Sequence, residues 1–155
     1  MVTVGASARS GNGPTLSREG PQRQLDQQSP PEFWGRLVAA VFELPGVEEG
    51  HSQVSPASSR AVFLTQRIEE LSPERSLAPG DRLEPVHLHG VHDTSVHLVL
   101  PSERGAELVQ LGWAVPHQYA EFGTEFLIYG PRDEAELGIV IDIIRESLSF
   151  AEAES

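Results

Sequence analysis

Histidine is concentrated in one short stretch of this 155-residue chain. Four of its six histidines fall between positions 87 and 97, in the sequence HLHGVHDTSVH. Imidazole titrates near neutral pH, so it can serve as a general base, a proton donor or a metal ligand. The stretch is therefore the first candidate for a functional site.

Apolar residues alternate with these histidines in a way that is typical of a β-hairpin. Two strands are expected, at residues 83–89 and 95–100, and each would bury its apolar residues on one face. His87, His89 and His97 would then share the opposite face, because a slip by one residue would bury all of them against the core.

The same alternation predicts how the two strands pair. The pairing that buries both apolar sets places Leu88 opposite Leu98 and His89 opposite His97. It needs a turn of odd length, most simply at residues 92–94. Directly opposed residues have Cβ atoms about 4.5–5.5 Å apart, so facing imidazoles could share a proton, a metal ion or a substrate.

Three interpretations of this cluster remain open. An H-x-H pair that faces a third histidine supplies three nitrogen ligands, as in open zinc, copper or iron sites, and His117 or Glu125 could complete the set. Alternatively, the cluster performs metal-free acid–base chemistry, with His92 and Asp93 orienting or polarising a neighbour. The third alternative is that these are exposed strand histidines without a function.

Composition excludes several other classes of function. The formal net charge is −12, and we find no basic stripe that could bind nucleic acid. The absence of cysteine excludes disulfides and thiolate chemistry, and the chain has no P-loop and no nucleophile elbow. It has no membrane-spanning apolar run and no apolar signal core. We expect a cytoplasmic protein with a small-molecule partner, no nucleic acid and no membrane contact; a homodimer stays open.

The chain is expected to form one α+β domain over residues 29–151, behind a disordered tail over residues 1–28 that is rich in Gly, Ser, Gln and Arg. Apolar periodicity predicts the order α-β-β-β-α-β-α, with the helices on one face of a mainly antiparallel sheet. Besides the hairpin, the expected strands are residues 61–64 and 124–129, and residues 113–122 are expected to be irregular.

Three motifs in the second half of the chain resemble the luciferase domain of bioluminescent fungi and its bacterial relatives. They are HLHGVHDTSVHLVLP, ELVQLGWAVPH and GTEFLIYGPRDEAEL, and the resemblance covers about residues 60–151. The fungal members of that family oxidise a hydroxylated styryl-pyrone with molecular oxygen and need no flavin or ATP. The resemblance therefore implies an oxygenase that acts on an enol, a pyrone or a polyketide-like phenol, with oxygen as co-substrate and no required cofactor.

The matched motifs and the predicted hairpin together indicate the candidate site residues. The candidate catalytic residues are His87, His89, His97, His117, Glu125 and Arg132. The candidate substrate contacts are His92, Asp93, Trp113, Tyr119, Phe126 and Tyr129. Arg132 would stabilise the charge of an enolate or peroxide. Two alternatives remain: an enzyme that depends on a divalent metal at His87, His89 and His97, and a non-catalytic binding module for a small molecule or a protein.

Overall fold

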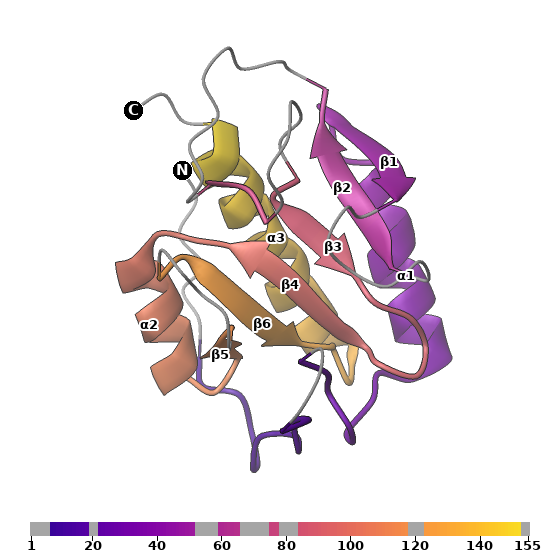
Figure 1. Ribbon diagram of the computed structural model, residues 1–155. Helices are drawn as coiled ribbons and strands as arrows, with labels where there is room; N and C mark the ends of the chain where they lie inside the picture. The colour runs from indigo at the N-terminus through magenta and orange to yellow at the C-terminus, as the bar shows by residue number, and fades with distance from the viewer. Residues whose placement is uncertain are drawn as a thin grey trace.

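The computed structural model describes residues 7–18, 22–51, 59–65, 75–77, 84–117 and 123–152. Within them, six strands form one antiparallel sheet in the order β1-β2-β3-β4-β6-β5, accompanied by three helices (Figure 1). The fold is the α+β class that the sequence predicts. The elements are α1 (Pro31–Phe42), β1 (Val47–His51), β2 (Arg60–Leu64), β3 (Val86–Leu88), β4 (Ser95–Val99), α2 (Ser102–Gln110), β5 (Ala114–Pro116), β6 (Glu125–Tyr129) and α3 (Glu134–Glu152).

All three helices lie on one face of the sheet and form a single hydrophobic core with it. In Figure 1, α1 and α3 pass behind the strands. Helix α1 buries Trp34, Leu37 and Val41, which recur at helical spacing, and Pro31 suits its first turn because the fixed φ of proline is already helical. The strands contribute alternate apolar residues to the same core, among them Val86, Leu88, Val96, Leu98, Phe126 and Ile128.

This alternation leaves a second face of the sheet away from the helices. Strands send successive side chains to opposite faces, so His87 on β3 and His97 on β4 lie on this second face. Leu127 on β6 pairs with His97 and belongs to it as well. We call this surface the histidine face; the core therefore holds the strands that carry the candidate site.

The structure adds two strands that the apolar pattern does not predict. Strands β1 and β5 form the two edges of the sheet, and β5 falls within the stretch that was expected to be irregular. The sequence of β1 is VEEGH and that of β5 is AVP, so neither shows a clear alternation. An edge strand has a neighbour on one side only and is defined by backbone pairing, which side-chain patterns do not report.

The N-terminal segment also differs from the sequence expectation of a disordered tail over residues 1–28. Its described parts, residues 7–18 and 22–28, lie against the domain, and the side chain of Gln24 is fully buried. The Gln24 side chain accepts a hydrogen bond from the backbone N–H of Gly130 at 3.1 Å, and Ser7 O accepts one from Trp113 Nε1 at 2.9 Å. Disorder was expected because the segment has few apolar residues to bury. The described parts are held against the domain by hydrogen bonds of side-chain amides and of the backbone instead.

No helix among the described residues combines the length and the apolar character needed to cross a bilayer.

Candidate functional site

The hairpin brings the histidines together in a register that differs from the predicted one. His87 pairs with His97, and Val86 pairs with Leu98, so β3 is shifted by two residues along β4. The prediction that His89 lies opposite His97 is therefore wrong, as is the three-residue turn at residues 92–94. A shift by two residues keeps every side chain on its face, because the period of a strand is two. The histidines consequently still share one face.

A longer loop makes this register possible. The last strand pair before the loop joins Leu88 and Val96, and the backbone N–H of Asp93 donates to Gly90 O at 3.0 Å to form a turn. The N-terminal segment holds the loop from outside: the Gln28 side chain accepts hydrogen bonds from the backbone and hydroxyl of Thr94 at 2.6 and 2.8 Å. Contacts from a distant segment thus help to set the pairing of the two strands.

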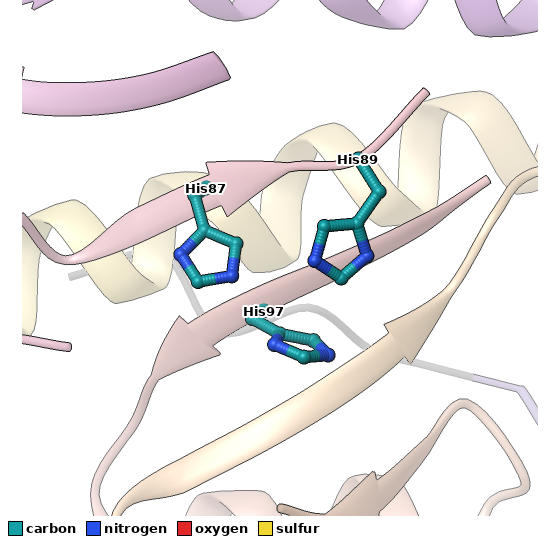
Figure 2. Close-up of side chains that lie close together, drawn as sticks. All are labelled: His87, His89 and His97. Atoms are coloured by element: carbon teal, nitrogen blue, oxygen red, sulfur yellow. The ribbon is translucent and has the colours of Figure 1, made fainter. Parts of the chain in front are cut away.

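Three imidazole rings converge on the histidine face (Figure 2). The ring centroids of His87 and His97 are 5.0 Å apart, those of His89 and His97 are 4.4 Å apart, and those of His87 and His89 are 5.2 Å apart. One ring nitrogen from each residue lies within 4.8 Å of the other two. The residues are only 4–8 % exposed, so the cluster is part of the interior of the protein. We call these three residues the histidine triad.

Carboxylates, one buried and one partly exposed, contact two of the three rings. Nδ1 of His87 lies 3.1 Å from Oε2 of Glu84, which has no exposed surface. Nδ1 of His89 lies 2.8 Å from Oδ2 of Asp93 and 2.9 Å from Oγ of Ser95. A carboxylate partner favours the tautomer in which Nδ1 donates the hydrogen bond and Nε2 keeps its lone pair. Within the described residues, Nε2 of His87 and Nε2 of His97 are buried without a hydrogen-bond partner.

Burial favours the neutral form of two of these rings, His87 and His97, by lowering their pKa values. Burial lowers the pKa of His87, although the hydrogen bond to Glu84 opposes this effect. Burial and the charges of His89, His87 and His117 lower the pKa of His97 well below its ordinary value. Desolvation disfavours the charged form of a base, and each ring would repel a second proton. At neutral pH, His87 and His97 are therefore uncharged and can offer lone pairs.

A fourth histidine extends the cluster toward solvent. His117 follows β5, and its ring centroid lies 4.7 Å from that of His97, edge to face. Nδ1 of His117 and Oε2 of Glu125 are 3.6 Å apart, and the two side chains are 14 % and 23 % exposed. Burial, followed by the charges of His87 and His89, lowers the pKa of His117 as well. This neutral ring is more exposed than the rings of His87 and His89.

The predicted aromatic contacts fall on both faces of the sheet. Trp113 and Phe126 belong to the hydrophobic core on the helix face, and Phe126 packs directly on Gly105 of α2. The structure therefore does not bring these two rings to the histidines. Tyr129 shares the histidine face but lies under the guanidinium of Arg9, 5.0 Å from the ring centroid. Tyr119 lies outside the described residues.

Two further candidates lie away from the triad. Arg132 is bound by Glu136, with Nη2 and Oε2 2.6 Å apart, and it also donates to Ser10 O at 2.9 Å. The guanidinium of Arg132 therefore binds the start of α3 and the N-terminal segment. His92 is exposed in the hairpin loop. Asp93, in contrast, is in the cluster, but through its contact with His89 rather than as an independent group.

Sequence reasoning missed Glu84. The residue precedes Pro85, three positions before His87, and no periodicity marks it because it lies just outside β3. Its backbone is fixed by two hydrogen bonds, from Glu84 N to Ser76 Oγ at 3.0 Å and from Leu77 N to Glu84 O at 2.8 Å. The sequence signal that could have identified Glu84 is its position three residues before His87.

Comparison with known proteins connects this site to a family. The Luciferase domain family matches residues 82–147, which include the triad, His117 and Glu125. Over 92 % of its length the chain is 30 % identical to a luciferase of Armillaria gallica and 29 % identical to luciferases of Armillaria ostoyae and Neonothopanus nambi. It spans 59 % of the length of each of these relatives. No solved structure matches the chain significantly. The resemblance predicted from the sequence is thereby confirmed.

Proposed function

We propose that this chain, whose residues 82–147 match the Luciferase domain family, is a small-molecule enzyme that oxygenates an enol, a pyrone or a polyketide-like phenol. The observation that carries the proposal is the four-histidine cluster, which is buried at one end and partly exposed at the other, where the His117 side chain is 14 % exposed. A site of this kind offers a partly exposed base beside buried imidazoles that are shielded from water. The name of the fungal relatives, luciferase, is consistent with oxygen chemistry.

The first step that we propose is removal of a proton by His117. A base must reach the substrate, and His117 lies at the accessible end of the cluster. Its ring is neutral at pH 7, because burial lowers its pKa. The carboxylate of Glu125, 3.6 Å away, would stabilise the imidazolium that forms. In this proposal, His117 is the catalytic base and Glu125 is its positioning residue.

The second step joins the deprotonated substrate to oxygen. The enolate carbon passes one electron to molecular oxygen, and the two radicals combine into a carbon–oxygen bond. The resulting peroxide anion takes back the proton from His117, so substrate and oxygen form one hydroperoxide and the base is restored. The substrate is oxidised by two electrons and oxygen is reduced to the peroxide level. In this proposal, oxygen reacts beside the buried triad.

Oxygen uptake tests the proposal directly. The full chain is incubated with hydroxylated pyrones and related enols, and oxygen consumption is recorded together with light. His117→Gln should lower the rate by about 100-fold or more, which is the usual contribution of a general base. The control is His51→Gln in β1, because this strand forms the opposite edge of the sheet from β5. The control variant should keep the rate.

Two results would overturn the proposal. The first is tight binding of these compounds without any oxygen uptake, which would instead indicate a binding module. The second is an unchanged rate in His117→Gln, which would remove the proposed base from the mechanism.

A further inference from the structure

We infer that the histidine triad binds one divalent transition-metal ion, with Glu84 and Asp93 as hydrogen-bond partners that hold the ligands in place. The ion would sit on the oxygen side of the proposed site. The inference deepens the proposed function and rests on it only for the use of the ion in the reaction; binding itself stands on the geometry of the triad.

The spacing of the nitrogen atoms fits such an ion after a small adjustment. One ring nitrogen from each of His87, His89 and His97 lies within 4.8 Å of the others. Metal–imidazole bonds of about 2.1 Å in tetrahedral geometry place the nitrogens roughly 3.4 Å apart. The rings must therefore approach one another by at most about 1.4 Å, which rotations of the side chains can supply without moving β3 or β4.

Hydrogen bonds already prepare two of the three ligands. Histidines that bind metals usually donate their second ring N–H to a carboxylate or a carbonyl, which fixes the tautomer and the direction of the lone pair. Glu84 does this for His87 at 3.1 Å, and Asp93 does it for His89 at 2.8 Å. Asp93 is itself held, because its Oδ1 accepts from Gln24 N at 2.9 Å and from Ser95 Oγ at 2.7 Å.

Burial makes a bound ion a better explanation than an idle cluster. Within the described residues, Nε2 of His87 and Nε2 of His97 are buried without a hydrogen-bond partner. A buried polar atom without a partner is costly, and native proteins rarely carry two of them side by side. One metal ion would satisfy both atoms together with the third ring. The alternative that these are strand histidines without a function leaves the two Nε2 atoms unexplained.

The ligand chemistry selects the class of metal. Three neutral imidazoles suit zinc, iron, copper or cobalt, whereas magnesium and calcium prefer oxygen ligands. The two carboxylates lie behind the imidazoles rather than among them, so they would offset the double charge of the ion without binding it directly. Three protein ligands leave at least one position for water or substrate, which is the arrangement of catalytic zinc sites. Such an ion supplies Lewis-acid polarisation of a bound oxygen atom.

Metal titration of the full chain without a histidine tag tests the inference. The protein is freed of metal with a chelator, titrated with Zn²⁺ in a calorimeter, and titrated with Co²⁺ while its visible absorption is recorded. We expect one ion per chain and cobalt bands typical of nitrogen ligands in four-fold coordination. His87→Ala and His89→Ala should each abolish the cobalt bands.

Conservative variants separate a metal site from a merely structural cluster. Glu84→Gln and Asp93→Asn keep the size of the side chain, and each should weaken zinc binding by about 10- to 100-fold, as loss of such a partner does elsewhere. His92→Ala is the matched control, since this histidine lies in the same hairpin but is exposed in its loop. It should bind zinc as the unaltered chain does. Circular dichroism verifies that each variant is folded; should the alanine variants unfold, the two conservative variants decide.

Three outcomes would overturn the inference. One is zinc binding no stronger in the unaltered chain than in the folded His87→Ala/His89→Ala variant. Another is an equal loss of binding in His92→Ala. The third is unchanged zinc affinity in both Glu84→Gln and Asp93→Asn. Because no substrate is present in these titrations, failure here leaves the oxygen-uptake result standing, and zinc binding without oxygen uptake would refute only the proposed reaction.

Discussion

Acid should destabilise the metal-free protein through its buried histidines. The pKa of His97 is held well below its ordinary value, mainly by burial and then by the charges of His89, His87 and His117. In the unfolded chain the same ring has a pKa of about 6.5. Below that pH the unfolded state binds more protons than the folded state, so stability is fully present above pH 6.5 and is lost as the pH falls.

The size of this effect follows from the linkage relation. If the folded ring of His97 takes up no proton, lowering the pH from 7 to 5 removes about 2 kcal/mol from the free energy of unfolding. The pKa values of His87 and His117 are also lowered by burial, so both residues add to the loss with the same sign. A total of this size is a large part of the roughly 5–15 kcal/mol that stabilises a typical domain.

Urea unfolding between pH 7 and pH 5, with a chelator present, measures the loss. The free energy of unfolding should fall with the predicted sign, and His97→Asn should have a shallower pH dependence, by up to about 2 kcal/mol over this range. His92→Asn is the control, because His92 is exposed in the hairpin loop and its removal should leave the slope unchanged. Stability that stays constant from pH 7 to pH 5, or a slope that His97→Asn does not alter, would refute the reasoning.

Two further predictions concern the scaffold behind the site. A Cβ atom at Gly105 of α2 would lie 2.0 Å from Cζ of Phe126, so Gly105→Ala should destabilise the protein by about 1–3 kcal/mol. A Cβ atom at Gly138 of α3 would meet nothing within 4 Å, so Gly138→Ala should stabilise the protein by roughly 0.5–1 kcal/mol. Thermal unfolding checks both variants: the melting temperature should fall for Gly105→Ala and rise for Gly138→Ala. The carboxylate of Glu146 is 3 % exposed and is bound by Arg104 at 2.9 Å, so Arg104→Met should cost about 3 kcal/mol in urea unfolding; an unchanged midpoint would show that Glu146 finds another partner.

Local pattern was sufficient to predict the fold class and the face that carries the histidines. The apolar stripe of α3 and the alternation in β3 and β4 mark which side chains are buried, and burial is a property that each segment expresses on its own. The same alternation placed His87, His89 and His97 on one face. Family resemblance was likewise carried by contiguous motifs and could be recognised without a structure.

Tertiary structure alone decided which residues meet. A period of two determines the face of a strand but cannot distinguish registers that differ by two residues, so the pairing of His87 with His97 depended on the loop and on the N-terminal segment that holds it. Edge strands β1 and β5 depended on backbone pairing. Glu84 and Gln24 became part of the site through hydrogen bonds between segments that have no apolar signal.

The sequence by itself thus determined that three histidines share one face of an antiparallel sheet, since side-chain alternation is local. Only the tertiary structure decided that the carboxylates of Glu84 and Asp93 stand behind two of them and that His117 extends the cluster toward solvent. The physical reason is that hydrophobic burial acts along each strand, whereas the hydrogen bonds and ring contacts that complete the site join residues from separate parts of the chain.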